Sequence, residues 1–212
     1  ELLHSRWLCV RINRKRSSIS VKPGDRVLDV CAGTNGVGIE LLQKQADISV
    51  FAIDRNRAMQ EVGRDLARTR GLRIQPVIGD AHQLPFPDDS FDIVTLQWAS
   101  RHLRIVDLYL EINRILKPGG CFYHCDMLRP ERKLVQALYS AYLWVCVSII
   151  ALVFRSSPKA LACRDYFIRA VQMFHSSAEL TRLLVKTGFI DVYSRTEAGG
   201  IVTSHKATKR MA

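Results

Sequence analysis

The sequence lacks the paired cysteines, internal repeats and compositionally biased tracts that mark several protein classes. Its six cysteines lie at irregular spacings with no C-x-x-C pair, which argues against a disulfide framework and against a structural zinc site. In a chain of 212 residues, such cysteines indicate reduced, mostly buried thiols and a cytoplasmic location. Residues 121–126 combine cysteine, histidine and aspartate, but on a strand Cys121 and Cys125 share one face while His124 points to the other. We therefore expect no metal site.

Acidic residues are also scarce, with 20 Asp and Glu against 31 Lys and Arg, so the formal net charge is +11. This excess suits anionic partners such as acidic lipid headgroups, phosphorylated metabolites or nucleic acid. The positive charge is spread along the chain and forms no single stripe, so nucleic acid is not the expected partner. Residues 1–20 have the pattern of a basic amphipathic helix, and they lack the continuous apolar core of a signal peptide.

Apolar strand-like runs alternate with helical patterns through the first 130 residues. The strand-like runs cover residues 26–31, 48–54, 72–80, 91–98 and 121–127, and the helical patterns cover 37–45, 56–70 and 104–117. Several of these strands are apolar throughout, which predicts a parallel sheet covered by helices on both faces. Further helices are expected at 160–174 and 177–187, and two strand-like stretches follow at 189–195 and 200–207.

Residues 134–154 contain no charged side chain over 21 positions, which is long enough for a transmembrane helix. A span here would put the last two strands on the opposite side of the membrane from the first five, and they could not join one sheet. We therefore expect a helix that is buried or that covers a substrate. Contact with a membrane surface is the alternative.

The segment VLDVCAGTNG at residues 27–36 runs from an apolar strand through a turn of short side chains into a helix. Short side chains let the backbone approach a ligand closely, and a helix N-terminus attracts negative groups. The dinucleotide fingerprint G-x-G-x-x-G is absent, because the glycines fall at 33, 36 and 38. By itself the segment fits a dinucleotide or a nucleoside equally well.

Two aspartates follow the next two strands. Asp54 ends the second strand, 21 residues after Gly33, and Asp80 lies in the sequence Gly79-Asp80-Ala81 at the end of the third. A carboxylate at the first spacing is placed to accept hydrogen bonds from ribose hydroxyls, and parallel strand ends face one crevice. Each acid alone is also a plausible helix N-cap. Their occurrence on successive strand ends favours a shared binding site.

These residues resemble class I S-adenosylmethionine-dependent methyltransferases, and more specifically the C-methyltransferases of ubiquinone and menaquinone biosynthesis. The likeness extends from about residue 20 to 207, and its quinone part rests mainly on Arg101-His102 and the GGIVTSHKA stretch. The other matching stretches are VLDVCAGTNG, VFAIDRNRAM, GDAHQLPFPDDSFDIVTLQWASRH, EINRILKPGG, DYFIRAVQMF and ELTRLLVKTGF.

The resemblance implies an α/β fold of Rossmann-like type, with a seven-stranded, mostly parallel sheet whose last strand is antiparallel. One methyltransferase domain would fill residues 1–212. Within it, 1–20 would form the basic N-terminal helix, 21–130 the cofactor-binding core, 131–187 a helical substrate-covering region inserted before the final strands, and 188–207 the last two strands.

The resemblance also implies a cofactor, S-adenosyl-L-methionine, with S-adenosyl-L-homocysteine as product. Gly33 and its loop would lie under the methionine part, Asp54 would hold the ribose, and Asp80 with the Ala81 amide would hold the adenine. Asn35 stands where many relatives have glycine, and asparagine tolerates the left-handed conformation that such a turn needs. The complete expected set is Asp29, Cys31, Ala32, Gly33, Thr34, Asn35, Asp54, Arg55, Met59, Asp80, Ala81 and Gln97.

The implied acceptor is a small, apolar or prenylated aromatic molecule such as a quinol. Removing a phenolic proton makes the ring carbon nucleophilic, so we expect His102 to assist proton removal and Arg101 to stabilise the phenolate. The expected substrate-lining residues are Trp98, Tyr139, Tyr142 and Trp144. The uncharged run and the basic helix together predict peripheral contact with an anionic membrane. A homodimer and a monomer both stay open.

Three alternatives share the cofactor motifs. One is a methyltransferase acting on another lipid, a sterol or a phenolic small molecule, and a second is a non-catalytic scaffold that binds S-adenosylmethionine. The third, a nucleic-acid methyltransferase, is disfavoured because the fourth strand ends in Leu96-Gln97-Trp98-Ala99 and lacks the Asn-Pro-Pro-aromatic signature.

Overall fold

The computed structural model describes residues 19–153, 168–169 and 172–211. The basic helix predicted at the N-terminus therefore lies almost entirely outside the described residues. The same holds for most of the helix expected over 160–174.

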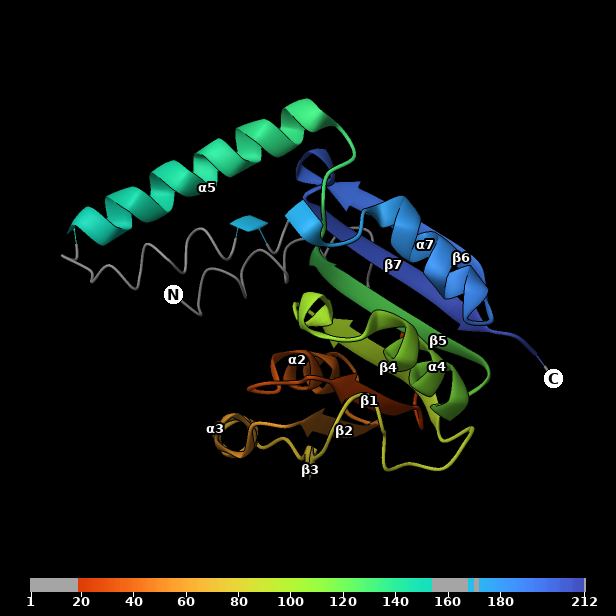
Figure 1. Ribbon diagram of the computed structural model, residues 1–212. Helices are drawn as coiled ribbons and strands as arrows, with labels where there is room; N and C mark the ends of the chain where they lie inside the picture. The colour runs from red at the N-terminus through yellow and green to blue at the C-terminus, as the bar shows by residue number, and fades with distance from the viewer. Residues whose placement is uncertain (1–18, 154–167, 170–171, 212) are drawn as a thin grey trace.

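The described residues form one seven-stranded sheet in the order β3-β2-β1-β4-β5-β7-β6 (Figure 1). The first five strands are parallel, and β7 runs antiparallel to both of its neighbours, β5 and β6. This confirms the predicted fold class, including the antiparallel last strand. The strands are β1 (Arg26–Val30), β2 (Ser49–Asp54), β3 (Gln75–Ile78), β4 (Phe91–Gln97), β5 (Leu116–Met127), β6 (Phe189–Glu197) and β7 (Val202–Lys209).

Helices cover both faces of the sheet, which is why its central strands are apolar on both sides. Val27 of β1 belongs to a core with α2 and α3, whereas the next residue, Leu28, belongs to a core with α4 and α7. The helices are α2 (Gly36–Lys44), α3 (Arg57–Arg68), α4 (Ile105–Ile115), α5 (Lys133–Val153) and α7 (Ser177–Lys186), with the short 3₁₀ turns η1 (Ser100–His102) and η2 (Ala198–Gly200).

Two strands, β3 and β5, differ most in length from the prediction, and the bounds of the others agree to within two residues. β3 covers only residues 75–78 of the predicted 72–80, because it is an edge strand that pairs with β2 alone. β5 begins at Leu116, where a helix end was predicted, because Leu116 already pairs with Phe91 of β4. The register then shifts, so that Cys121 pairs with Ile93, and Gly119 in the intervening residues has a positive φ of 76°.

Of the two expectations for the uncharged segment, burial was wrong, and coverage of a substrate stays a prediction. α5 forms as expected, but no part of its most apolar stretch, Lys133–Ile150, is buried inside the molecule, and it is long and apolar enough to cross a membrane by length and composition. β5 precedes this helix in the chain and β7 follows it. These two strands pair directly in one sheet, so both ends of the helix connect to the same side of any membrane. In Figure 1, α5 extends along one side of the molecule, away from the sheet.

α3 approaches the loop between β1 and α2 closely at Gly63. A Cβ atom added there would lie 2.7 Å from the carbonyl carbon of Thr34 and 2.7 Å from Nδ2 of Asn35. A backbone atom and a buried side chain leave little room to move, so only glycine allows this approach.

We expect Gly63→Ala to destabilise the protein by about 1–3 kcal/mol, the usual cost of overpacking. Thermal unfolding of the ligand-free protein measures this. Gly36→Ala is the matched control, because a Cβ atom at Gly36 meets nothing within 4 Å. An equal melting temperature for Gly63→Ala and the wild type would show that the loop at Thr34 and Asn35 moves to accommodate the added Cβ atom at little cost.

Candidate active site

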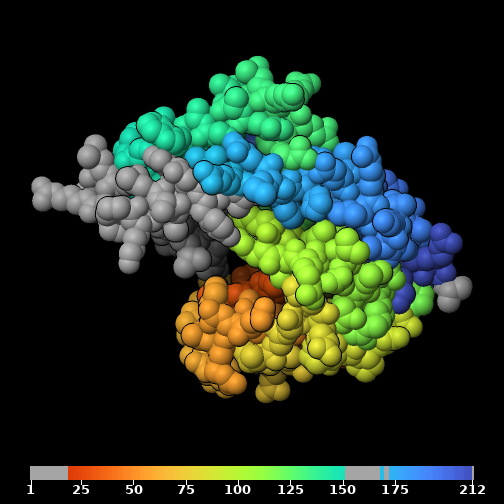
Figure 2. Space-filling view, viewed as in Figure 1, coloured from red at the N-terminus to blue at the C-terminus, as the bar shows by residue number. Residues whose placement is uncertain are grey.

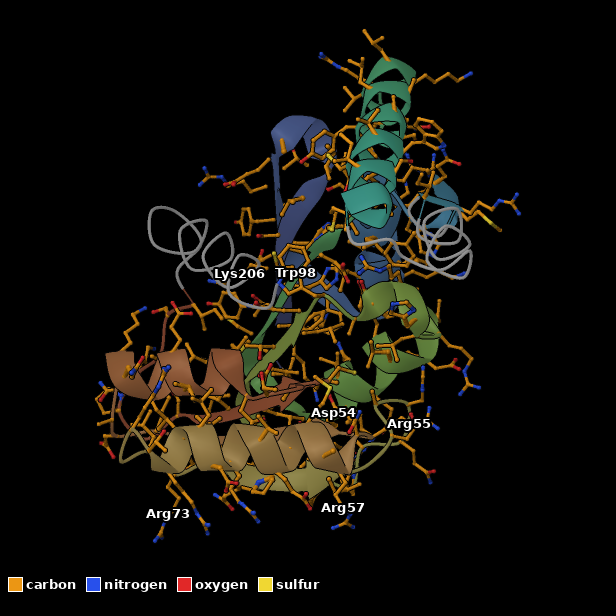
Figure 3. The ribbon with its side chains drawn as sticks, turned by 90° about the vertical axis from the view of Figure 1, so that its left-hand side faces the viewer. Asp54, Arg55, Arg57, Arg73, Trp98 and Lys206 are labelled. Carbon is orange, nitrogen blue, oxygen red and sulfur yellow. The ribbon has the colours of Figure 1, made fainter. Side chains whose placement is uncertain are left out.

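The carboxyl ends of β1 to β5 lie at one edge of the sheet. Val30 at the end of β1 pairs with Ile53 of β2 and Leu96 of β4, and Gln97 at the end of β4 pairs with Cys125 of β5. Figure 3 looks onto this edge and shows Asp54 with Trp98 above it. In Figure 2 the surface is hollowed between the orange residues of α3 and the yellow-green residues after β4, with red residues from the start of the described chain at its floor.

The loop after β1 takes a left-handed backbone at three alternate positions. Cys31, Gly33 and Asn35 have φ values of 54°, 53° and 59°, which confirms the conformation predicted for Asn35. Its backbone N–H donates to the carbonyl oxygen of Ala32 at 2.8 Å. The side chain of Gln60 on α3 donates to Oδ1 of Asn35 at 3.1 Å and to the carbonyl oxygen of Gly33 at 3.2 Å. The loop is therefore a fixed structure.

Asp54 joins the end of β2 to this loop. Its Oδ2 accepts a hydrogen bond from the Gly33 amide at 2.9 Å, and its Oδ1 accepts one from the Asn56 amide at 2.8 Å. Met59, at the start of α3, lies beside the same turn, because its Cε atom is 3.1 Å from where a Cβ of Gly33 would be. The structure thus brings Gly33, Asp54 and Met59 together as the sequence predicted.

Asp29 of β1 is a buried carboxylate with one unsatisfied oxygen. Thr95 of β4 donates to Oδ1 at 2.6 Å, while Oδ2 has no partner in residues 19–153, 168–169 and 172–211. Burial raises the pKa of Asp29 to about 7; the Thr95 bond opposes this rise and the negative charge of Asp54 adds to it. Burial, with the charges of Asp54, Asp29 and Asp80, also raises the pKa of the Cys31 thiol to about 12. These carboxylates therefore act on one small region, which favours a cationic ligand.

Asp80 is fixed by His82. Its Oδ1 accepts hydrogen bonds from the His82 amide at 2.9 Å and from His82 Nδ1 at 2.7 Å, and these bonds lower the pKa of Asp80. His82 Nε2 accepts from the Arg104 amide at 3.0 Å. The other carboxylate oxygen of Asp80 lies 4.0 Å from the exposed guanidinium of Arg55. Ala81 is buried behind it.

The residues after β4 form the other side of the site. Trp98 has a left-handed backbone, with φ of 59°, and its amide donates to the carbonyl oxygen of Cys125 at 3.0 Å. Arg101 on η1 donates to Asp126 Oδ1 at 3.3 Å, and its side chain is only 12% exposed. His102, on the same turn, is exposed. A left-handed non-glycine residue that is not asparagine or aspartate is strained, and such strain is typical of functional sites.

The predicted substrate-lining residues of α5 divide into two groups. Tyr139 is half-buried, and the charge of Arg101 acts on its hydroxyl, opposing the rise in its pKa that burial causes. Tyr142 and Trp144 are 62% and 52% exposed. The structure therefore brings Tyr139 to the Arg101 side of the site and leaves the other two on the surface of α5.

Four residues of the site were missed in the sequence. Gln60 and Gly63 hold the loop, and a glycine inside a helical pattern was the available signal. Thr95 is a polar residue within the apolar run of β4. Asp126 is the penultimate residue of β5 and so lies at its carboxyl end, as Asp54 does in β2, and the rule that found Asp54 applies to it as well.

Comparison with known proteins agrees with this geometry. Residues 3–209 match the model of the ubiE/COQ5 methyltransferase family. The chain is 30% identical over 193 residues to the ubiquinone/menaquinone biosynthesis C-methyltransferase UbiE of Teredinibacter turnerae, covering 89% of this chain and 76% of that protein. It is 32% identical over 197 residues to the demethylmenaquinone methyltransferase of Corynebacterium glutamicum, covering 92% and 81%.

Among solved structures, a putative methyltransferase from Bacillus halodurans matches with a TM-score of 0.67 at 18% identity, covering 97% of this chain and 99% of that one. This likeness shows the fold. The family match extends over nearly the whole chain and confirms the predicted activity and cofactor. The chain belongs to the ubiE/COQ5 methyltransferase family and is an S-adenosylmethionine-dependent methyltransferase.

Proposed function

We propose that this enzyme methylates a ring carbon of a small, apolar, prenylated quinol. The names of its relatives support this acceptor class. The observation that carries the proposal is the gathering of Asp29, Asp54 and Asp80 around a left-handed loop, opposite an arginine held at the end of β4. The first set suits a cationic nucleoside, and the arginine suits an acceptor that becomes an anion.

The residues present fit S-adenosylmethionine, which supplies an activated methyl group when bound. Oδ2 of Asp29 has no hydrogen-bond partner among the residues that the structure describes, so it suits a cationic group of the methionine part. Asp54 would hold the ribose hydroxyls, and Oδ2 of Asp80 with the Ala81 amide would hold the adenine. Met59 lies beside Gly33 and would pack near the adenine ring. The rest of the proposed binding set is Cys31, Ala32, Gly33, Thr34, Asn35, Arg55 and Gln97.

We expect the affinity for S-adenosylmethionine to rise about tenfold between pH 6 and pH 8, because a pKa near 7 leaves Asp29 mostly protonated at the lower pH. In the ligand-free protein the sign is opposite. The folded state keeps this proton up to about pH 7, whereas the unfolded chain releases it near pH 4, so the free energy of unfolding should fall as pH rises through that window.

Calorimetric titration at several pH values and thermal unfolding measure these two slopes. Asp29→Asn should remove most of the pH dependence of the affinity and of the free energy of unfolding. Asp65→Asn, at an exposed position of α3, should leave both pH dependences unchanged. Persistence of the full pH dependence of affinity in Asp29→Asn would exclude this carboxylate as its source.

Arg101 and His102 are the proposed acceptor-side residues. Methylation at carbon requires the phenol to lose its proton, so that charge reaches the ring carbon. Arg101 is fixed by its ion pair with Asp126, and the positive charge of its guanidinium would stabilise the phenolate. His102 on the same turn would take the phenolic proton, directly or through water. Trp98 and Tyr139 would line the ring, and Tyr142 with Trp144 would contact the prenyl tail.

We expect His102→Ala to lower kcat about 100-fold or more, the usual contribution of a general base. Arg101→Gln should lower kcat while leaving the affinity for S-adenosylmethionine unchanged. The assay is transfer of a labelled methyl group to prenylated quinols, with simple phenols, sterols and phospholipids as competing acceptors. The control is His175→Ala, in the loop that precedes α7, which should leave kcat unchanged. Unchanged turnover in His102→Ala would refute the base, and preference for another acceptor would refute the quinol.

We also propose that the enzyme works in the cytoplasm and binds an anionic membrane surface through α5. Exposed apolar side chains recur at spacings of three and four along this helix, so they lie on one side of it. They are Leu134, Leu138, Tyr142, Val145 and Ile149. Arg132 and Lys133 precede them and are exposed. An apolar stripe with adjacent basic residues is the pattern of an interfacial helix.

Liposome flotation tests the membrane proposal. We expect binding to vesicles that contain acidic lipid and weaker binding to neutral ones, since each basic side chain near the surface contributes about 1 kcal/mol. Leu138→Glu should reduce binding, whereas Val185→Glu, at an equally exposed apolar position of α7, should not. Absence of binding to either vesicle would refute this part alone, leaving the acceptor chemistry untouched.

A further inference from the structure

A fully buried carboxylate lies at the end of β5. Asp126 is 0% exposed, and four groups donate hydrogen bonds to it. Its Oδ2 accepts from the Ser100 amide at 2.9 Å and from the Ser100 hydroxyl at 2.5 Å. Its Oδ1 accepts from the Met127 amide at 2.7 Å and from the Arg101 guanidinium at 3.3 Å. A charge buried this deeply is stable only when it is matched by such donors.

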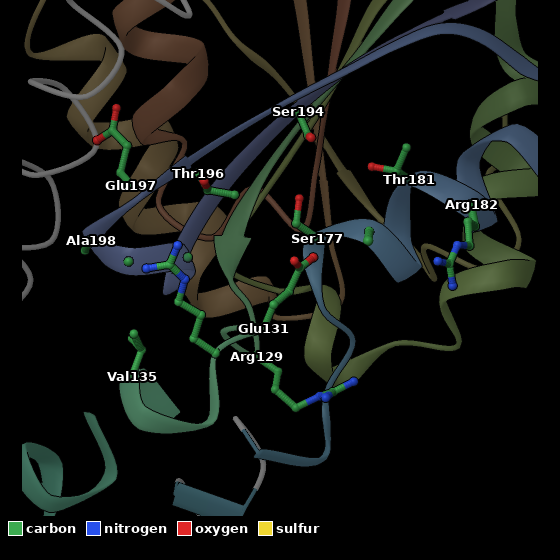
Figure 4. Close-up of a pocket in the computed structure, with 14 residues that line it drawn as sticks. Arg129, Glu131, Val135, Ser177, Thr181, Arg182, Ser194, Thr196, Glu197 and Ala198 are labelled. Carbon is green, nitrogen blue, oxygen red and sulfur yellow. The ribbon is translucent and has the colours of Figure 1, made fainter. Parts of the chain in front are cut away.

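From Ser100 a chain of buried polar contacts continues across the sheet. His124 Nε2 lies 3.1 Å from the Ser100 hydroxyl oxygen, and His124 Nδ1 lies 3.4 Å from His205 Nδ1 on β7. The two rings stack with centroids 5.5 Å apart. His205 Nε2 lies 3.4 Å from the hydroxyl oxygen and 3.3 Å from the carbonyl oxygen of Ser177 on α7. Ser177 lines a surface pocket of about 760 Å³ (Figure 4), so the chain runs from Arg101 to a separate part of the surface.

The proton positions along this chain follow from the carboxylate at its end. Burial lowers the pKa of both His124 and His205 to about 3, so each ring is neutral and carries one proton. An ionised Asp126 can only accept, so the Ser100 hydroxyl donates to it and in turn accepts from Nε2–H of His124. His124 Nδ1 is then bare. The Ser177 carbonyl oxygen can only accept, so His205 donates to it from Nε2–H, and Nδ1 of His205 is bare as well.

We propose that Asp126 is a positioning residue that fixes Arg101 at the acceptor site, and that Ser100 and His124, whose ring stacks on His205, form a neutral support for its carboxylate. The role of Arg101 at the acceptor rests on the proposed function. A long arginine side chain loses precision without a fixed partner, and a displacement of about 1 Å at a reacting group can cost about 100-fold in rate. With Ser100 held by His124, Asp126 keeps all four of its hydrogen-bond donors.

The proton arrangement can be measured without any acceptor. In ¹⁵N-histidine-labelled protein at pH 7, NMR should show both His124 and His205 protonated at Nε2, and both rings should stay neutral at pH 5. The Arg101 guanidinium should rotate slowly in the wild type and rapidly in Asp126→Asn. The reverse tautomers, a charged ring at pH 5, or equal rotation in both proteins would overturn the proposal.

The positioning role predicts non-additive kinetics. Asp126→Asn should lower kcat between about tenfold and 100-fold, with the affinity for S-adenosylmethionine unchanged. The double variant Asp126→Asn, Arg101→Gln should be no slower than Arg101→Gln alone, because both changes remove one function. Multiplied losses would overturn the proposal. Asp92→Asn is the matched control, since Asp92 pairs with Lys117 between the same two strands at the opposite edge of the sheet and should leave kcat unchanged.

Ser100→Ala keeps the proposal testable should Asp126→Asn fail to fold. It removes the hydroxyl that links Asp126 to His124 but keeps the backbone donor and Arg101. We expect about a threefold to tenfold loss of kcat, as for a shift smaller than 1 Å, together with loss of the ordered tautomers. Unchanged tautomers would overturn the support. A wild type that methylates no quinol would instead refute the proposed function, while the NMR result would still decide the positioning of Arg101.

Discussion

The hydrogen bond from the Gly33 amide to the Asp54 carboxylate is the contact on which the proposed cofactor side of the site depends. It ties the end of β2 to the loop after β1, and so sets the distance between two strand ends. Gln60 reinforces it from α3 by bonding to both Gly33 and Asn35. The close approach at Gly63 lets α3 reach the loop. Strain in the left-handed residues is therefore held by contacts with two neighbouring elements.

Charge is divided between the two halves of the site. Asp29, Asp54 and Asp80 lie on the β1 to β3 side, and Arg101 lies on the β4 to β5 side with its own buried counterion. A cationic methyl donor and an acceptor that becomes anionic need opposite environments only a few ångströms apart. The strand order places β1 and β4 side by side in the middle of the sheet, so the two environments meet where the parallel strands end.

The parts that could be predicted from the sequence are those set by local pattern. Apolar runs and turn residues located each strand of the sheet, and the spacing of Gly33, Asp54 and Asp80 identified three strand ends. The exposure of α5 could not be predicted, because an apolar helix has the same composition whether protein or another apolar phase covers it. The contact between His124 and His205 joins residues 81 positions apart, and its partner strand is known only once the topology is. Tyr142 and Trp144 illustrate the same limit, since their exposure depends on where α5 lies.

The position of β7 between β5 and β6 has a consequence for how the chain acquires its fold during synthesis. β6 contacts the rest of the sheet only through β7, which is made after it. Until β7 emerges from the ribosome, β5 presents an open edge, and β6 and α7 have no strand to join. A nascent chain must therefore protect an unpaired edge and the bare apolar surface of α5 at the same time, which makes this the stage most exposed to aggregation.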